Sequence, residues 1–188
     1  SKIFFEIIVA PSFDSAALSL FSKKKNLRVL SLVKYKPKKS FGKEIAGGWV
    51  IQETDLSKMD ISAVKTVTKK SPTKAELLTL DLAWRAVKHV KSNAIVVAHN
   101  KKIISISGGQ TSRVDAVKYA LTKTVVPAGA VIASDAFFPF RDSVDLMSRY
   151  GISSIIQPGG SIRDGDVVAA CNEHKISMVF TSFRVFKH

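Results

Sequence analysis

One segment of the chain combines aromatic rings with charged groups, Ser134-Asp-Ala-Phe-Phe-Pro-Phe-Arg-Asp142. It follows an apolar run directly, where an ordinary connection would favour small polar residues. Rings beside Asp135 and Asp142 suit a flat heterocycle, which needs a stacking face and acceptors for its amino groups. The alternative is a hydrophobic plug bordered by solvated charges, and the segment alone favours neither interpretation.

Two glycine-rich segments follow other apolar runs, Ser107-Gly-Gly-Gln-Thr-Ser-Arg113 and Gln157-Pro-Gly-Gly-Ser-Ile-Arg-Asp164. Glycine pairs let the backbone approach a ligand closely, and Ser112 can begin a helix whose free N–H groups favour an anion. Neither segment contains the lysine of a phosphate-binding loop. Each could therefore serve only to turn the chain.

The remaining reactive residue types predict structural roles. The histidines lack the spacing of zinc ligands, and no Ser, His and Asp arrangement resembles a catalytic triad. His174 is expected to close a helix, where a cation complements the dipole. The single cysteine, Cys171, excludes an internal disulfide and is expected in the core, with Trp49 and Trp84 as packing residues.

Composition bounds the class of protein. The chain has 188 residues, 46% of them hydrophobic, which suffices for a packed core. No apolar run approaches the roughly 20 residues of a membrane span. The chain starts with Ser1 in place of an initiator Met, and its first residues do not resemble a signal peptide. We therefore expect a cytoplasmic protein and a piece of something longer.

The net charge of +14 makes nucleic acid a candidate partner. The densest basic stretches, 23–25, 34–43 and 69–70, lack the interleaved aromatic residues that stack on bases. A solvated basic face that attracts small anions, such as a phosphate, is the preferred interpretation, and a basic nucleic-acid-binding module remains the alternative.

The elements that would position these segments form an α/β pattern. Strands separated by helices indicate βαβ units and a sheet covered on both faces, with ligands at the carboxyl ends of the strands. The expected strands are 94–98, 103–106, 130–134, 154–156 and 177–180, and the expected helices are 112–124, 143–150 and 163–174.

Before residue 93 the pattern is more varied. It predicts a strand over 4–10, a helix over 15–23 capped by Asp14, and a strand over 27–33. A basic loop over 37–42 and a strand over 45–52 follow, with Gly47-Gly48 as a bulge or a close approach of the backbone. A long helix with one apolar face begins at Pro72-Thr73.

Five motifs together, in order and spacing, resemble the AICAR formyltransferase part of PurH proteins. They are Lys91-Ser-Asn-Ala-Ile95, Gly109-Gln-Thr-Ser-Arg-Val-Asp115, Ala133-Ser-Asp-Ala-Phe-Phe-Pro-Phe-Arg-Asp142, Gln157-Pro-Gly-Gly-Ser-Ile-Arg-Asp164 and Phe183-Arg-Val-Phe-Lys-His188. The likeness covers essentially the whole chain and implies the C-terminal half of the formyltransferase domain. It implies a cytidine deaminase-like three-layer α/β/α sandwich with a mixed, largely parallel sheet. Residues up to about 70 would end the preceding subdomain, and about 71–188 would form the second.

The resemblance also implies a reaction. The family transfers a formyl group from 10-formyltetrahydrofolate to the 5-amino group of 5-aminoimidazole-4-carboxamide ribonucleotide (AICAR), a step of purine (IMP) synthesis. Asn93 would orient AICAR at the reacting centre, and Phe137 and Arg184 would also bind this nucleotide. The folate site would contain Arg113, Val114, Asp142, Ser161 and Ile162. His188 is a further catalytic candidate, and a potassium ion would lie near Ser92 and Asp135.

Two parts of the family pattern do not occur in the sequence. One is the Lys-His-Ala-Asn-Pro-Cys-Gly-like segment, whose Lys-His pair transfers protons, and the other is the IMP cyclohydrolase domain. The resemblance therefore predicts a fragment that is inactive alone and that pairs as a homodimer or with the missing N-terminal half. A non-catalytic folate- or nucleotide-binding domain is the alternative.

Overall fold

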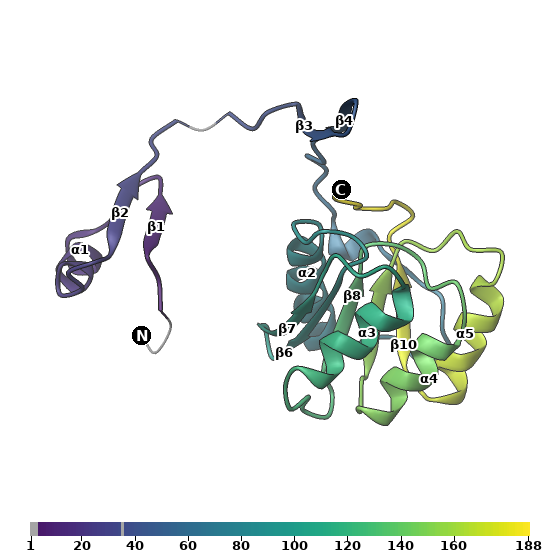
Figure 1. The fold of residues 1–188 in the computed structure, drawn as a ribbon. Coiled ribbons are helices and arrows are strands. Elements are labelled where there is room, and N and C mark those ends of the chain that lie inside the picture. Colours follow the sequence, from purple (N-terminus) through teal and green to yellow (C-terminus); the bar gives the residue numbers. More distant parts are fainter. Residues whose placement is uncertain (1–3, 35) are drawn as a thin grey trace. The chain divides into compact units, whose positions relative to one another are not determined.

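The computed structural model describes residues 4–34 and 36–188, which form two compact units (Figure 1). The first unit ends at Thr54, and the second is Asp55–His188. The second unit thus begins upstream of the subdomain boundary expected near residue 70, and the subdomain assignment stays a prediction. The chain start and Tyr35, within the basic stretch 34–43, lie outside the described residues.

The first unit contains a parallel β–α–β arrangement. Strand β1 (Ile7–Ala10) pairs in parallel with β2 (Arg28–Ser31), and helix α1 (Ser15–Ser22) connects them. The Asp14 side chain accepts a hydrogen bond of 2.6 Å from the Ala17 N–H, which confirms the predicted helix cap. Both strands are shorter than predicted.

A β-hairpin replaces the single strand predicted over 45–52. Strands β3 (Ser40–Ile45) and β4 (Gly48–Glu53) pair antiparallel, and Gly47 turns the chain between them with φ +85°. The predictions of a bulge and of a close backbone approach at Gly47-Gly48 were both wrong, because the pair forms a tight turn with nothing within 4 Å of either Cβ position. The packing role expected for Trp49 was also wrong, since this residue is 65% exposed.

The second unit begins with a short 3-10 helix, η1 (Ile61–Ala63), and a two-residue strand, β5 (Lys65–Thr66), neither of which was predicted. Helix α2 (Lys74–Val87) starts in a capping box in which Thr73 and Glu76 bond reciprocally. The other strands are β6 (Ile95–His99), β7 (Lys102–Ser107), β8 (Val131–Ser134), β9 (Ser154–Gln157) and β10 (Ser177–Phe180). The other helices are α3 (Arg113–Thr122), α4 (Asp142–Arg149) and α5 (Asp164–Glu173).

The six strands of the second unit form one mixed sheet in the order β5-β10-β9-β8-β6-β7. Strands β8, β9 and β10 are parallel, and β6 runs antiparallel to both β7 and β8. Strand β5 pairs antiparallel with the other edge of β10. Four strands therefore share one direction and two oppose them, which confirms the α/β class and the mixed sheet.

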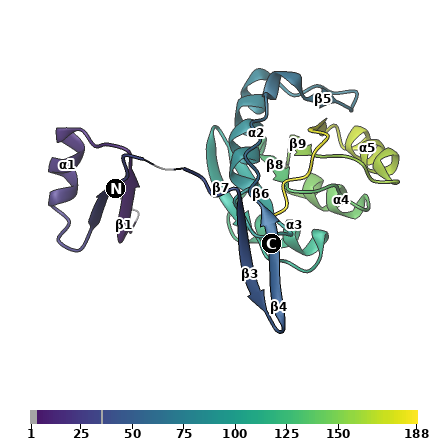
Figure 2. The ribbon, with the colours of Figure 1, turned by 90° about the horizontal axis from the view of Figure 1, so that it is seen from above.

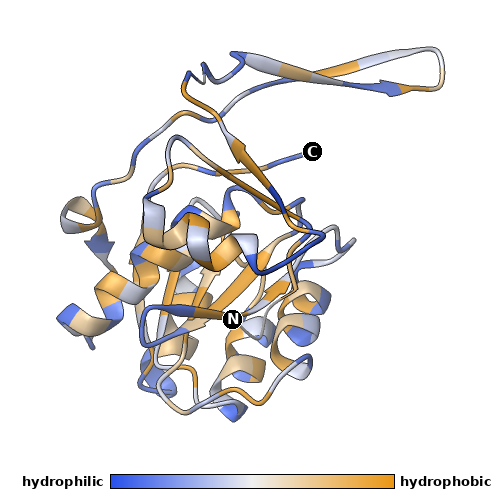
Figure 3. Cartoon of the chain, turned by 90° about the vertical axis from the view of Figure 1, so that its left-hand side faces the viewer, coloured by the Kyte–Doolittle hydropathy of each residue, from blue (hydrophilic) through white to orange (hydrophobic). Residues whose placement is uncertain are grey.

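Helices cover both faces of this sheet (Figures 1 and 2), so the three-layer arrangement is confirmed. Alternate strand residues point to opposite faces: Ile95, Val97 and Ile132 pack with α3, α4 and α5, whereas Val96 and Ala133 pack with α2. Figure 3 shows these strands coloured as hydrophobic between their helices. Trp84 and Cys171 lie in the two cores, as predicted.

Candidate functional site

The predicted segments meet at one edge of the sheet because of the strand directions. Ile95, at the start of β6, pairs with Ser134, at the end of β8, and with Ser107, at the end of β7. The carboxyl ends of β7 and β8 therefore lie beside the amino end of β6. Strands β9 and β10 run parallel to β8, so the segments after Gln157 and Phe180 leave from the same edge.

A buried ion pair lies beneath this edge. Nη1 of Arg113 donates to Oδ1 of Asp135, and the two side chains are 6% and 0% exposed. The same Nη1 also donates to the Ala94 carbonyl at 3.1 Å, and the Ala94 N–H donates to Asp135 Oδ1 at 3.1 Å. The carboxylate and the guanidinium thus neutralise each other in the interior, where an unpaired charge would be costly.

Asn93 lies directly above this pair and is half-buried. Its Oδ1 accepts a hydrogen bond of 2.8 Å from Nη2 of Arg113, and its Nδ2 donates at 2.8 Å to the Gln110 carbonyl. The Asn93 N–H donates to the same carbonyl at 3.1 Å. The side chain predicted to orient AICAR is therefore held between the α3 start and the loop before it.

The C-terminal tail is bound to the same place. The Ser92 N–H donates to the Lys187 carbonyl at 2.9 Å, and the Lys187 N–H donates to Ser92 Oγ at 3.2 Å. The Val185 N–H donates to the Asp135 carbonyl at 3.1 Å. These bonds place Arg184 and His188 at the edge that carries Asn93. The sequence did not predict the bonds themselves, because main-chain hydrogen bonds leave no signal in the residue types.

Potassium was expected near Ser92 and Asp135. Ser92 Oγ donates to Asp135 Oδ2 at 2.5 Å, and Asp135 Oδ1 is bound by Arg113 and Ala94. Both carboxylate oxygens and the hydroxyl thus have partners within the chain, and Arg113 already balances the carboxylate charge. This arrangement does not call for a cation, and potassium stays a prediction. Among the described residues, no group of three or more His, Cys, Asp or Glu side chains could hold a metal ion.

The aromatic segment after β8 contains the predicted plug, and its use as a heterocycle site stays a prediction. Phe138 is fully buried and is a plug, whose N–H donates to the side chain of the buried Gln157 at 3.0 Å. Phe137 is half-buried and lies under Arg184, with the guanidinium carbon 4.7 Å from the ring centroid. Phe140 is 51% exposed and lies under Arg163 at 5.2 Å. Two of the three rings thus remain beside cations at the surface.

The two glycine-rich turns owe part of their composition to the chain itself. A side chain on Gly108 would collide with Val90 and the Lys91 carbonyl, and one on Gly159 would collide with the Phe180 ring. Gly160 has φ +93° and open space around it. The close approaches expected at a ligand are therefore, at Gly108 and Gly159, approaches to other parts of the protein.

The residues expected at the folate site differ in exposure. Asp142 is exposed at the start of α4, and Ile162 is fully exposed in the turn before α5. Ser161 and Val114 are half-buried. Arg113 is only 7% exposed, and its guanidinium is engaged by Asp135 and Asn93. These folate roles stay predictions.

A network of charges joins α4 to α5 beside the aromatic segment. Arg141 pairs with Asp145 at 3.0 Å and with Glu173 at 2.6 Å, and His174 Nε2 lies 2.7 Å from Asp145. Hydrogen bonds from Arg141 and then from His174 lower the pKa of Asp145 to about 2. The same arginine lowers the pKa of Glu173. His174 closes α5, as predicted, and it also joins the two helices.

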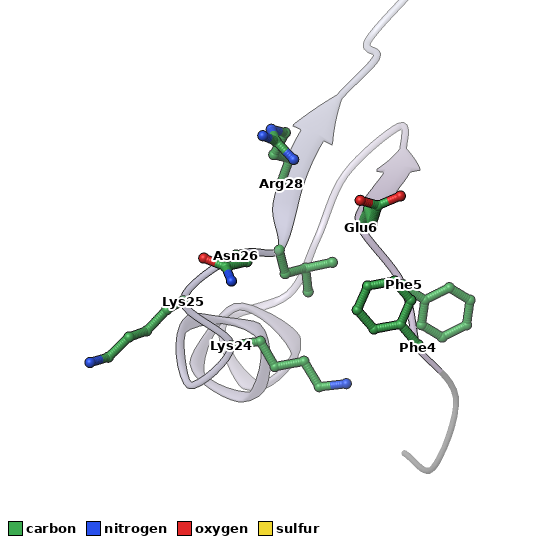
Figure 4. A pocket seen from close by; sticks show the side chains of 8 residues that line it. Phe4, Phe5, Glu6, Lys24, Lys25, Asn26 and Arg28 are labelled. Atoms are coloured by element: carbon green, nitrogen blue, oxygen red, sulfur yellow. The ribbon is translucent and has the colours of Figure 1, made fainter.

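One cavity of the second unit touches this edge at Gln110. That cavity, of about 520 Å³, is lined by Gln110 and by four residues of α3, Asp115, Lys118, Tyr119 and Thr122. In the first unit, a cavity of about 570 Å³ adjoins Phe4, Phe5, Lys24 and Arg28 (Figure 4). Figure 4 shows Lys25 pointing away from the two rings, which suits the solvated basic face predicted for this stretch.

The chain is similar in sequence to known proteins. Residues 1–123 match the family model described as "AICARFT/IMPCHase bienzyme". Curated relatives described as "Bifunctional purine biosynthesis protein PurH" align with essentially the whole chain. The protein of Aquifex aeolicus is 45% identical over 192 residues, that of Persephonella marina 49% over 196, and that of Prochlorococcus marinus strain MIT 9515 50% over 190.

The alignments cover 99–100% of the chain but only 37–38% of each of these relatives. The chain thus spans little more than a third of their length. Among solved structures, a diaminohydroxyphosphoribosylaminopyrimidine deaminase/5-amino-6-(5-phosphoribosylamino)uracil reductase of Thermotoga maritima matches 55% of the chain and 34% of its own length. The identity is 19% and the TM-score 0.37, which is too low to define a fold. The deaminase-like comparison stays a prediction.

Among the described residues, no helix is both long and apolar enough to span a membrane.

Proposed function

The chain belongs to the AICARFT/IMPCHase bienzyme family, and we propose that it carries one side of an AICAR formyltransferase site, as the C-terminal half of that domain. The reaction is formyl transfer from 10-formyltetrahydrofolate to AICAR in purine synthesis. The observation that carries the proposal is the meeting of Asn93, the Arg184–Phe137 stack and the turn at Ser161 at one sheet edge.

AICAR is a flat aminoimidazole carboxamide with an anionic phosphate, and this edge offers a partner for each part. Asn93 can hydrogen-bond the amine, and the Phe137 ring offers a stacking face. Arg184 is an exposed residue, and its guanidinium suits a phosphate. The Ser92–Lys187 bonds keep the tail beside Asn93, so that these groups can act on one ligand.

The folate would occupy the neighbouring surface. In this proposal, the Asp142 carboxylate accepts hydrogen bonds from the amino groups of the pterin, while Ile162 and Val114 supply apolar contact. Ile162 is fully exposed, and an apolar side chain so exposed gains free energy when a ligand covers it. Asp142 also accepts from the Ser143 N–H at 2.6 Å, which fixes the orientation of its carboxylate at the start of α4.

Formyl transfer requires that the amine nitrogen attack the formyl carbon, lose a proton and displace the folate N10, which takes up a proton. Orientation of the amine is the part that Asn93 can supply. The Lys-His segment that serves as proton carrier in the family does not occur in this sequence. General acid–base catalysis contributes about 10²–10⁴-fold to rates, so turnover by this chain alone should fall short by at least that factor.

Calorimetric titration with AICAR tests the nucleotide part of the proposal. The chain should bind AICAR, and Arg184→Gln should weaken binding by about 10- to 100-fold, because a charged hydrogen bond is lost. The matched control is Arg149→Gln, at the exposed carboxyl end of α4, which should leave the affinity unchanged. Absence of AICAR binding, or equal losses in the two variants, would overturn the assignment.

A turnover assay separates this proposal from its alternative, a non-catalytic binding domain. The chain is incubated with AICAR and 10-formyltetrahydrofolate. A second incubation adds the part of a PurH relative that precedes the region aligned with this chain. Formyl transfer should depend on the added segment. A preceding segment that binds the chain without restoring formyl transfer would favour the non-catalytic alternative.

A further inference from the structure

The carboxamide of Asn93 is held at both ends. Its oxygen accepts from Arg113 Nη2, and its nitrogen donates to the Gln110 carbonyl, both at 2.8 Å. A guanidinium can only donate and a main-chain carbonyl can only accept. If the carboxamide turned by 180°, two donors would face each other on one side and two acceptors on the other. The surroundings therefore permit one orientation of this side chain.

Arg113 is itself fixed. Its Nη1 is bound by the Asp135 carboxylate and the Ala94 carbonyl, and Asp135 accepts in turn from the Ala94 N–H and from Ser92 Oγ. Both charged side chains are buried, so that neither can turn to solvent without leaving the other unpaired. The orientation of Asn93 is thus set by groups that cannot rearrange independently.

We propose that Arg113 and Asp135 are positioning residues, which fix the Asn93 carboxamide for the ligand. Among the described residues, the bonds above use one lone pair of Oδ1 and one hydrogen of Nδ2. One acceptor position and one donor position remain on the half-buried side chain. A ligand must then present a donor to Oδ1 and an acceptor to Nδ2 in a fixed order.

This inference rests on the proposed function for the identity of the ligand. An amine and a neighbouring formyl oxygen present a donor and an acceptor side by side. A carboxamide free to turn would offer the reverse order half of the time. Arg113 would therefore act through Asn93, from beneath the ligand surface, and Arg113→Lys separates this role from mere stability. Lysine keeps the charge for Asp135, but its single nitrogen cannot also reach the Ala94 carbonyl and Asn93.

Nuclear magnetic resonance can observe, without any ligand, whether Arg113 and Gln110 hold the Asn93 carboxamide, an arrangement called the clamp below. The side-chain NH₂ pair of Asn93 is identified in the ¹⁵N-labelled chain as the pair lost in Asn93→Asp. In Arg113→Lys the carboxamide loses the charged hydrogen bond to its oxygen and can turn away from the Gln110 carbonyl, so the hydrogen exchange of its NH₂ pair should accelerate about tenfold or more. Arg85→Lys, in the exposed pair with Asp81, is the control and should leave the Asn93 pair unchanged. An Asn93 pair that is equally protected in Arg113→Lys overturns the clamp.

The affinity for AICAR is the second readout. Arg113→Lys should raise the Kd by about tenfold while the rest of the spectrum stays that of a folded chain. If Arg113→Lys does not fold, Asp135→Asn replaces it and should loosen the Asn93 pair in the same direction. Loss of protection at Asn93 with unchanged AICAR affinity overturns the positioning role. Absence of AICAR binding by the unsubstituted chain overturns the proposed function instead, and the exchange measurement then still decides whether the clamp exists.

Discussion

Arg113 donates a hydrogen bond to Asp135 inside the second unit, although the two residues are separated by most of α3 and all of β8 in the sequence. Both side chains are almost completely buried. The pair lies where β6, β8 and α3 begin or end, so it joins the elements that carry the candidate site. The same ion pair therefore contributes to the stability of the second unit and to the geometry of the candidate site.

Arg113→Met should destabilise the second unit by about 3–5 kcal/mol, because it leaves the Asp135 carboxylate buried and unpaired. The control is Arg85→Met, which removes an exposed pair with Asp81 and should cost about 0–1 kcal/mol. Urea unfolding followed by circular dichroism measures both. Equal losses in the two variants would show that the Arg113–Asp135 pair is not desolvated.

The Asp145 network should make stability depend on pH in the acid range. The pKa of Asp145 is about 2 in the folded chain and about 3.9 in an unfolded one. A depressed pKa contributes stability that is present above about pH 4 and is lost as the pH falls towards 2. Asp145→Asn should therefore lower the urea midpoint at pH 6 and leave less difference from the unsubstituted chain at pH 2. A difference that is constant over this range would exclude the linkage.

Gly159 and Gly160 offer a matched comparison of backbone strain and steric collision. Both have positive φ, +73° and +93°, where alanine costs about 1–2 kcal/mol. Only Gly159 faces the Phe180 ring, and filling that space should cost about 1–3 kcal/mol more. The unfolding free energy should therefore be lower for Gly159→Ala than for Gly160→Ala. The reverse order would contradict the packing of this turn.

The first unit should open far more readily than the second. None of its described residues is buried, whereas β6, β8 and β9 lie almost entirely in the core. A two-stranded sheet with exposed apolar residues has little independent stability. Amide hydrogens of β1 to β4 should exchange faster than those of β8 by at least about two orders of magnitude. Comparable protection in β1 and β8 would require contacts that the first unit does not show.

Sequence reasoning succeeded where burial on two faces repeats regularly. The strand over 177–180 was predicted with its observed bounds, and the helices of the second unit were predicted within about two residues, because apolar runs, caps and glycines mark their ends. Strand β5 was missed because two residues carry no periodicity. The hairpin of β3 and β4 was missed because Gly47-Gly48 was interpreted as a bulge or close backbone approach within one strand.

The candidate site was predictable in its parts but not in its connections. Residue types pointed to Phe137 and Asp142, the family resemblance added Asn93, and the strand directions bring their segments to one edge. The partner of Arg113 is a distant carboxylate, and the tail is fixed at Ser92 by main-chain groups. Such pairings depend on the folded topology, and no local pattern encodes them. The sequence also did not show that Phe138 is the buried ring of its segment, since only the packing shows which ring is buried.

Formyl transfer by a chimeric protein tests the central claim most directly. In it, this chain replaces the 192 aligned residues of the Aquifex aeolicus PurH protein. The chimera should transfer the formyl group from 10-formyltetrahydrofolate to AICAR, and Asn93→Ala in the chimera should lower kcat by about 10²-fold or more, as expected for loss of a group that orients the amine. A folded chimera without formyl transfer, or one indifferent to Asn93→Ala, would contradict the account.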